Sequence, residues 1–570
     1  MSNLTFTTFS ELEYKRPDFE SMSKIWQNAT QDILNAKCYE DIRGIIKEVD
    51  IASKHVTTMM TVASIRNTLN TTDEFYEKEN EYNETEYPAI TEYYVEYAKA
   101  LINSPFSSDI DEEYGKELLV SMQRDVDSFD PVMVPYMQKE SILCNRYQKI
   151  MATAKIPFRG EVYNLHGIRK FFENSDREIR RDAYKAYSDF YASNETELEE
   201  IFDELVMLRT EMGKALGYEN YIPLGYKLQG RSDYGWEEVA AFRKQVLEEI
   251  VPLCEKIYKA QAKRINVEEL KAFDETYIFP DGNAVPAGDD DFMIEQARKM
   301  YHDLSPETAE FIDFMIEHQL MDLKNKPNKA STGYMTELPD YDAPFVFSCF
   351  NGTIDDMSVL AHELGHAFAG YQAMRHQKIS DYIMCATDIA EIHSMSMEQF
   401  TYSYAEQFFG KDADKYRFAH LQDAITFVPF GVAVDEFQHI IYENPNLTPK
   451  ERTYEWHKLE EKYMPWRKYE NDEFFGRGGY WYHKLHIYLY PMYYINYTLT
   501  TIGAMEFKKR FEEDRESAWK DYLKLCNAGG SLNYLGLLKL ANLSVPFEDG
   551  GVRKAMSYAK EIILKNIGEK

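Results

Sequence analysis

Two histidines and a glutamate interrupt a stretch that is otherwise apolar or small, LAHELGH at residues 360 to 366. His362 and His366 are four residues apart, so on a helix both imidazoles project from one face and can bind one metal ion. With Glu363 this is the HExxH arrangement, in which the histidines hold zinc and the glutamate takes a proton from the zinc-bound water. Because burying these groups without partners would be costly, zinc binding is favoured over a purely structural role.

A catalytic zinc ion needs a third protein ligand and an open position for water. The best candidates lie in ATDIAEIHSMSMEQF, residues 386 to 400, which predicts a second helix with an apolar face. Glu391 and Glu398 are seven residues apart and share a face of that helix, so the spacing does not choose between them. Asp388 lies in the same run. His393 is a rival ligand, although a third histidine usually follows HExxH at a shorter spacing.

The run APFVFSCFNGT, residues 343 to 353, is β-prone and ends just before the HExxH stretch. An exposed strand edge at this place would pair with the backbone of an extended peptide. A core strand with no role in binding is the alternative, because short continuous apolar runs are typical of buried strands.

A tyrosine-rich segment, HKLHIYLYPMYYINY at residues 483 to 497, is the second candidate for contact with a peptide. Three tyrosines recur in it at helical spacing: Tyr490, Tyr494 and Tyr497. His486 lies four residues before the first of them, and Pro491 is expected to open a helix. Aromatic stripes usually pack in cores, but buried hydroxyls need partners, so these tyrosines are also candidate donors to a developing oxyanion.

Apolar residues recur at helical spacing from about residue 19 to 265 and again from about 355 to the end. Between 275 and 353, turn-rich segments alternate with short β-prone runs. The pattern predicts a mainly α protein with one small sheet.

Composition excludes several classes of partner. The 570 residues carry a formal net charge of −32, which would repel a phosphate backbone, and no basic stripe with interleaved aromatics is present. Nucleic acid is therefore not expected.

No signal-like N-terminus and no stretch of about 18 apolar residues occurs, so neither export nor membrane spanning is expected. The six cysteines form no CxxC pair, which favours reduced thiols in a cytoplasm.

The chain resembles the thimet oligopeptidase and oligoendopeptidase F family of zinc metallopeptidases, in particular its bacterial oligoendopeptidase branch. The blocks that carry the resemblance occur in this order: RNTLNTTDEFYEKENEYNETEYP, APFVFSCFNGT, HELGHAF, DIAEIHSMSME, HIYLYPMYYINYTL and AGGSLNYLGLLKLA. The resemblance implies a mainly α, two-lobed helical ellipsoid that encloses a deep substrate channel, with a small antiparallel β-sheet next to the zinc helix.

Carried over residue by residue, the resemblance makes Glu363 the general base. The ligands that it implies for one zinc ion per chain are His362, His366 and Glu391. The family's third ligand opens a block like EIHSMSME, which selects Glu391 over Glu398. Glu398 and Asp388 then resemble the partners that orient ligating histidines.

His486 and Tyr497 match the family's substrate-contacting and oxyanion-stabilising positions. Tyr490 and Tyr494 are further catalytic candidates in the same block. The glycines of FFGRGGYWYH, residues 474 to 483, are expected to let the preceding loop close over substrate. Three residues depart from the family's commoner types and bear on side-chain preference rather than on the chemistry: Cys349, Met492 and Asn496.

The expected activity is a zinc-dependent endopeptidase that hydrolyses internal bonds of short unstructured oligopeptides. An N-terminal helical region, residues 1 to 185, would form much of one lobe, and residues 186 to 570 would form the catalytic region. The nearest rival is a helical zinc carboxypeptidase or dipeptidyl carboxypeptidase, which must bind a C-terminal carboxylate. A peptide-binding protein without turnover is a rival of another class, but it has no need of Glu363. The sequence leaves open whether the protein is a monomer or a homo-oligomer.

Overall fold

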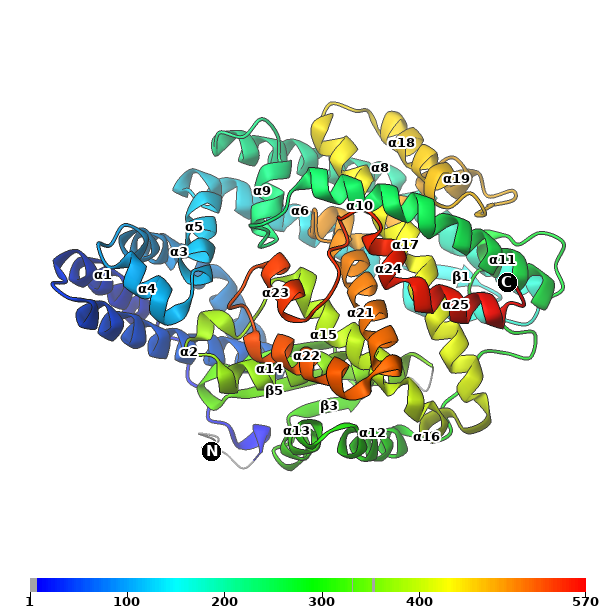
Figure 1. The fold of residues 1–570 in the computed structure, drawn as a ribbon. Coiled ribbons are helices and arrows are strands. Elements are labelled where there is room, and N and C mark those ends of the chain that lie inside the picture. Colours follow the sequence, from blue (N-terminus) through cyan, green and yellow to red (C-terminus); the bar gives the residue numbers. More distant parts are fainter. Residues whose placement is uncertain (1–7, 331, 351–353, 570) are drawn as a thin grey trace.

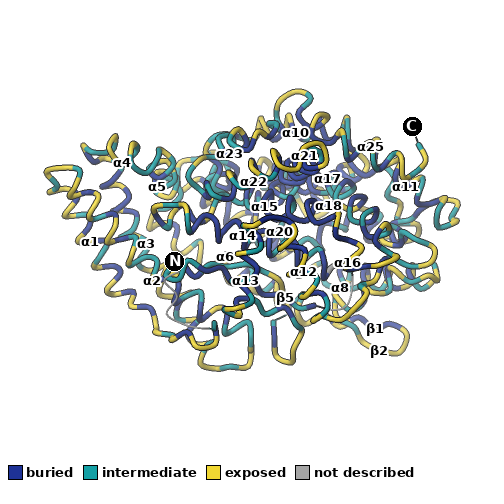
Figure 2. The backbone as a smooth tube through the Cα atoms, turned by 60° about the horizontal axis from the view of Figure 1, so that its bottom comes forward, coloured by how far each residue is buried: buried dark blue, intermediate teal, exposed yellow. Residues whose placement is uncertain are grey.

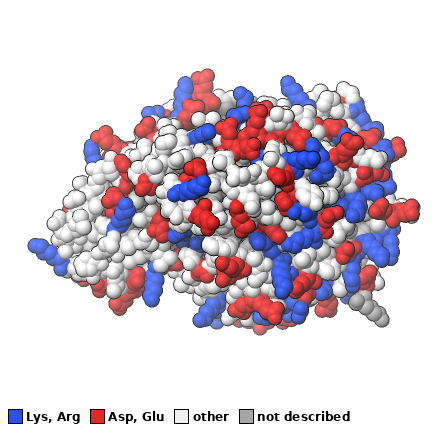
Figure 3. Space-filling model, turned by 90° about the horizontal axis from the view of Figure 1, so that it is seen from above, with Lys and Arg blue, Asp and Glu red and all other residues white. Residues whose placement is uncertain are grey.

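The computed structural model describes residues 8–330, 332–350 and 354–569. In these ranges the chain is mainly helical, with one two-stranded hairpin and one three-stranded sheet (Figure 1). The mainly α fold class expected from the sequence is therefore confirmed. On the face shown in Figure 3, acidic and basic side chains are interspersed rather than separated by sign.

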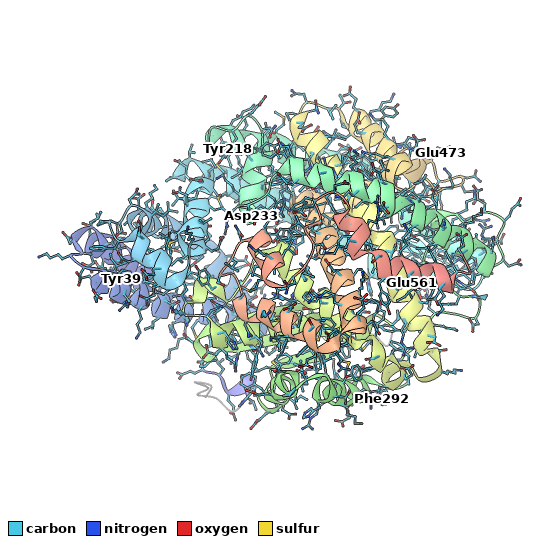
Figure 4. The ribbon with its side chains drawn as sticks, in the orientation of Figure 1. Tyr39, Tyr218, Asp233, Phe292, Glu473 and Glu561 are labelled. Carbon is cyan, nitrogen blue, oxygen red and sulfur yellow. The ribbon has the colours of Figure 1, made fainter. Side chains whose placement is uncertain are left out.

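A bundle of helices forms one end of the molecule, at the left of Figure 1, where Figure 4 labels Tyr39. Its helices are α1 (Phe19–Asn35), α2 (Tyr39–Leu69), α3 (Glu74–Ile102), α4 (Ser107–Tyr114) and α5 (Glu117–Ser128). Its own apolar core includes Trp26, Ile42, Leu101 and Met122. Ile379 and Tyr382, which come from far along the chain, pack into the same core. Between them, the backbone N–H of Ser380 donates to Asp50 Oδ1 at 2.7 Å, so the bundle is tied to the rest of the protein.

A hairpin and a series of helices connect this bundle to the sheet. The hairpin pairs β1 (Ile156–Phe158) with β2 (Glu161–Tyr163). The helices are α6 (Val134–Ala152), α7 (Leu165–Arg169), α8 (Arg177–Ala215), α9 (Ile222–Leu228), α10 (Trp236–Glu249), α11 (Val251–Arg264), α12 (Asp290–Leu304) and α13 (Pro306–Glu317). Residue 185, the expected boundary between the two regions, lies within α8, and the division stays a prediction.

The three-stranded sheet consists of β3 (Met321–Lys324), β4 (Tyr334–Leu338) and β5 (Ala343–Phe350) in the order β3-β5-β4. The expected small sheet is thus present, but it is mixed rather than wholly antiparallel, because β4 runs antiparallel to β5 and β3 runs parallel to it. The expected free edge on β5 is wrong, because β5 is the middle strand and pairs on both sides. The three residues that end the predicted run, 351–353, lie outside the described residues. Phe345, Val346 and Phe347 are at most 1% exposed, which explains the continuous apolar run.

A buried lysine forms hydrogen bonds to the sheet near the point where the register of β3 changes. The Nζ of Lys329 donates to Oδ1 and the carbonyl oxygen of Asp322, at 2.6 and 2.9 Å, and to the carbonyl oxygen of Lys324 at 2.9 Å. It also donates to the carbonyl oxygen of Ser348 in β5. Because the charge has an ionic partner and each proton an acceptor, this lysine can be buried at the sheet end that faces the HExxH helix.

The HExxH stretch forms the middle of α14 (Asp355–His376), which packs against β5. Its apolar residues are buried around the whole helix: Leu360, Ala361, Leu364, Ala367 and Phe368 are at most 1% exposed. The next helix, α15 (Thr387–Phe400), packs between α14 and α21 (Ile495–Glu513). These helices cross the buried centre of the molecule in Figure 2.

The remaining helices surround this centre, and Figure 4 labels Glu473 at α19. They are α16 (Ala405–Phe409), α17 (Ala413–Glu443), α18 (Pro449–Tyr463), α19 (Glu473–Gly476), α20 (Leu485–Leu489), α22 (Arg515–Ala528), α23 (Tyr534–Leu540), α24 (Gly551–Ala555) and α25 (Ser557–Asn566). The stretch Thr387–Glu443 is long and apolar enough to span a membrane by length and composition, but 67% of its apolar window is buried inside the protein. The core helix of a soluble protein meets the same criteria of length and composition.

The contact between α14 and α15 requires a residue without a side chain at position 365. A Cβ on Gly365 would lie 2.8 Å from Cα of Ser394 and 2.9 Å from Cβ of Met397. We expect Gly365→Ala to separate the helices and to lower the free energy of unfolding by about 1 to 3 kcal/mol. Gly370→Ala on the same helix is the matched control, because its nearest neighbour would be a Glu337 side-chain atom at 3.5 Å. Denaturant unfolding measures both, and equal stabilities would contradict the close-packing argument.

Candidate metal centre and active site

Three potential ligands meet where α14 packs against α15. His362 Nε2 and His366 Nε2 lie 3.1 and 3.4 Å from Oε2 of Glu391. One ligand atom from each residue lies within 4.8 Å of the other two, and no other such group of three occurs in the described part of the chain. Two imidazoles and a carboxylate form a donor set that suits divalent transition metals. The structure thus brings the three predicted ligands together.

Charge is balanced within this cluster. Burial would raise the pKa of Glu391, but His366 and His362 outweigh it and hold that pKa well below its usual range. Burial raises the pKa of Glu363, which the two histidines oppose and the carboxylates of Glu391 and Glu398 reinforce. Glu363 is therefore more basic than a carboxylate in water, which suits a group that accepts a proton and later returns it.

A hydrogen-bonded chain leads from His362 away from the ligand cluster. Nδ1 of His362 lies 2.7 Å from Oε1 of Glu398, as the expected orienting role requires. The other oxygen of Glu398 bonds to Nε2 of His420, whose Nδ1 bonds to the hydroxyl of Tyr402. Burial would raise the pKa of Glu398, but its bonds to both histidines lower that pKa to about 2. Glu398 therefore stays ionised between two imidazoles.

Two other polar residues of α15 do not join the cluster. Asp388, expected to orient a ligating histidine, instead accepts a hydrogen bond from the hydroxyl of Tyr234 at 2.7 Å, and burial raises its pKa to about 6. His393, the rival ligand, lies beside Cys385, with Nδ1 3.9 Å from Sγ. Burial lowers the pKa of His393 to about 3. Glu391 is the α15 side chain that reaches both histidines of the HExxH motif.

His486 lies in α20 among four tyrosines. The distances from its ring centroid are 4.9 Å to Tyr494 and 5.8 Å each to Tyr490, Tyr493 and Tyr497. Burial and the neighbouring Lys484 lower the pKa of His486 to about 3, so its imidazole is neutral. Burial and the carboxylate of Glu391 raise the pKa of Tyr497 to about 12, so its hydroxyl keeps its proton. Both side chains are neutral hydrogen-bond donors next to the ligand cluster, as an oxyanion site requires.

The other predicted tyrosines lie in different surroundings. Tyr490 is 49% exposed, whereas Tyr494 is 4% exposed and packs against Phe427 and Phe430. The ring of Tyr493, which the helical spacing does not mark, lies 5.3 Å from that of Tyr497, centroid to centroid. Burial and the carboxylate of Glu391 raise the pKa of Tyr493. It therefore lies beside both the donor tyrosine and a candidate metal ligand.

A turn explains why the tyrosine spacing misleads. Pro491 does not open a helix, because α21 begins four residues later, at Ile495. Met492 adopts the left-handed region with φ of 63°. Its backbone N–H donates to Gln438 Oε1 at 2.9 Å and its carbonyl accepts from Arg231 at 2.7 Å, which holds the turn. Departure from the helix at this turn directs Tyr493 toward the ligand cluster.

The packing of two of the glycines indicates a role other than the expected loop closure, which stays a prediction. Gly478 has φ of 106°, and a Cβ there would lie 2.2 Å from the carbonyl oxygen of Thr453 in α18. A Cβ on Gly479 would lie 2.7 Å from the carbonyl oxygen of Phe474. These two glycines allow close backbone contact.

Cys349, at the end of β5, is half-buried and its Sγ donates to the carbonyl oxygen of Ala330 at 3.0 Å.

Glu398 and His420 should influence metal binding without touching the ion. We expect Glu398→Gln and His420→Ala each to weaken metal affinity by about 10- to 100-fold, because His362 loses a fixed orientation. Competition with a chelator of known affinity measures this. His302→Ala is the control, since that histidine pairs with Asp313 at the surface and should leave affinity unchanged. Wild-type affinity in both test variants would contradict the orienting role.

Comparison with known families gives a consistent result over most of the chain. Residues 9–129 match the Peptidase M3 N-terminal domain, and residues 171–283 and 296–557 match Peptidase family M3. An oligoendopeptidase F homolog of Borreliella burgdorferi is 22% identical over 433 residues, which cover 73% of this chain and 70% of that protein.

Solved structures share both sequence and fold with this chain. A Pz peptidase A with an inhibitor is 43% identical, with a TM-score of 0.92 over 98% of this chain and 99% of that one. A Bacillus anthracis protein described as an oligoendopeptidase F is 39% identical, with a TM-score of 0.88 over 99% of both chains. The family matches, the shared fold and the assembled ligand cluster together show that the chain belongs to peptidase family M3, as an oligoendopeptidase.

Proposed function

We propose that this peptidase is a zinc-dependent endopeptidase that hydrolyses internal bonds of short unstructured oligopeptides. The observation that supports this best is the convergence of His362, His366 and Glu391, with Glu363 on the same helix as the two histidines. Two histidines and a glutamate are the ligand set of one class of catalytic zinc site, which leaves a position open for water. One zinc ion per chain would occupy it.

Each side chain then has a defined task. When bound, zinc would supply a Lewis acid that polarises the scissile carbonyl and lowers the pKa of water to about 7. Glu363 accepts a proton from the attacking water and returns it to the leaving amine. His486 and Tyr497 donate hydrogen bonds to the oxygen that gains negative charge, a contribution of about 3 to 4 kcal/mol for one such donor. Tyr493 packs edge-on against Tyr497, with ring centroids 5.3 Å apart, and so restricts where the Tyr497 ring can lie.

The cellular setting and the partners are proposed from the cysteines and the charge of the chain. The six cysteines are all unpaired in the structure, which supports a reducing compartment such as the cytoplasm. Oligopeptides are the proposed partners, and neither nucleic acid nor membrane is expected to bind. End-blocked peptides separate the proposed endopeptidase from the carboxypeptidase alternative, because only an endopeptidase cuts a chain whose C-terminus is blocked.

Two glutamates of the site should give different defects when changed to glutamine. Glu363→Gln should lower kcat for peptide cleavage by about 100-fold or more while one zinc per chain is retained, because only the proton acceptor is lost. Glu391→Gln should lower zinc content as well as cleavage, because it changes a ligand. Metal analysis of the purified variants and single-substrate kinetics decide the matter. Near-normal turnover in Glu363→Gln would exclude it as the general base.

Limited access to the site should select substrates by length and disorder. The side chains of His362, His366 and Glu391 are only 25%, 15% and 10% exposed, so a folded domain cannot reach them. We expect efficient cleavage of unstructured peptides of about 5 to 20 residues, a length set by an enclosed path at about 3.3 Å per residue. Reduced, alkylated casein-like chains and peptides cut from them should differ widely in kcat/KM. Comparable values for both would rule out the enclosed path.

A further inference from the structure

A large cavity lies next to the candidate active site and has no part in the chemistry described above. Its volume is about 900 Å³, and its walls come from α6, α7, α8 and the segments 272–276 and 480–489. Tyrosines supply much of the lining, among them Tyr147, Tyr184, Tyr187 and Tyr480. We call it the tyrosine cavity. Its size and largely apolar lining are typical of a ligand site.

Two positively charged side chains line the tyrosine cavity without an acidic partner. Arg169 at the end of α7 and Lys484 before α20 form no ion pair with any described residue. The one carboxylate in the lining is Glu275, and it is already engaged by Arg467, with Nε to Oε1 at 3.0 Å and Nη2 to Oε2 at 2.6 Å. In a chain of net charge −32, two cations without a counter-charge in one cavity are unusual.

The surroundings of Lys484 are aromatic. Its Nζ lies 4.3 Å from the ring centroid of Tyr494 and 5.8 Å from that of Phe430. Burial and the nearby Arg169 lower the pKa of Lys484 to about 7, and no acidic group opposes them. A bound anion would supply the missing charge and hold the ammonium in its protonated form.

The tyrosine cavity and the candidate active site take residues from the same short segment of chain. Lys484 precedes His486 by two residues, so their Cα atoms are at most about 7 Å apart. Both side chains contact the ring of Tyr494, with the His486 and Tyr494 centroids 4.9 Å apart. A peptide that passes His486 can therefore extend toward Lys484 and Arg169.

We propose that the tyrosine cavity binds a carboxylate of the peptide substrate, held by Arg169 and Lys484, and that this contact selects among peptides. The carboxylate belongs either to the peptide's C-terminus or to an acidic side chain. The tyrosine rings would pack against the residues between the scissile bond and that carboxylate. The inference rests on the proposed peptidase function, because the ligand is the substrate of that site.

Internally quenched peptides of one sequence test the proposal with the zinc-loaded full-length enzyme. Three forms are compared: a free C-terminal carboxylate, a C-terminal amide, and an amide whose last residue is replaced by glutamate. We expect kcat/KM to be about 10- to 100-fold higher for the best carboxylate form than for the plain amide, as for a hydrogen bond to a charged group. Comparison of the free carboxylate with the plain amide tests for binding of a terminal carboxylate. Comparison of the glutamate form with the plain amide tests for binding of a side-chain carboxylate. Equal values for all three would overturn the proposal.

Variants assign any preference to the tyrosine cavity. Arg169→Gln and Lys484→Met should each reduce the carboxylate-to-amide ratio toward one, and Lys484→Arg should restore it. Lys170→Gln is the matched control, because Lys170 adjoins Arg169 in sequence, does not line the cavity and should leave the ratio unchanged. A ratio that stays at the wild-type value in both Arg169→Gln and Lys484→Met would place the carboxylate elsewhere and overturn the assignment.

Binding measurements separate this proposal from the peptidase function itself. Calorimetry with zinc-loaded Glu363→Gln should show about tenfold tighter binding of the carboxylate form than of the amide, whether or not the wild type cleaves either. If the wild type cleaves neither form but the variant still binds the carboxylate form more tightly, the peptidase function is refuted and the carboxylate site remains supported. Cleavage of the free-carboxylate form alone would support the site and favour the carboxypeptidase alternative. Equal affinities would overturn the site.

Discussion

The contact of α14 with α15 at Gly365 determines the geometry of the whole site. Because no side chain separates the backbones there, Glu391 on α15 reaches both histidines of α14. A second glycine acts on the other side, since a Cβ on Gly503 of α21 would lie 3.0 Å from Ile392 Cδ1. The helix that carries Glu391 is thus held by a close backbone contact on one side and by the Ile392 side chain packed on Gly503 on the other. The same α21 also supplies Tyr497.

The interior around α15 contains far more polar groups than a helix core usually tolerates, and nearly every charge has a named partner. Glu398 is shared by two imidazoles, Asp388 accepts from Tyr234, and Lys329 is surrounded by four acceptors at the neighbouring sheet end. Charged groups in such an interior are costly to bury unless they are paired. The unpaired cations of the tyrosine cavity differ from this pattern, which is why they indicate a ligand.

The sequence predicts the local parts of this structure and misses those that depend on distant packing. The histidine pair can be predicted from the sequence because the helical period alone puts His362 and His366 on one face. Glu391 could be preferred to Glu398 only by resemblance, since both share a face of α15. His420 and Tyr402 carry no local signal, because their partners are chosen by the packing of α17 against the site. The helical spacing does not predict a role for Tyr493, because a turn at Met492 interrupts the helix.

The packing of Ile379 and Tyr382 into the core of the N-terminal bundle has a consequence for the order in which the protein assembles. During synthesis, α1 to α5 emerge first, but two of their core residues and the N–H partner of Asp50 emerge only after α14. Contacts between such distant segments form slowly, because a long loop must close before they stabilise the chain. The bundle therefore completes its core only after the HExxH helix has left the ribosome, and the active site, which also needs Tyr497 on α21, completes later still.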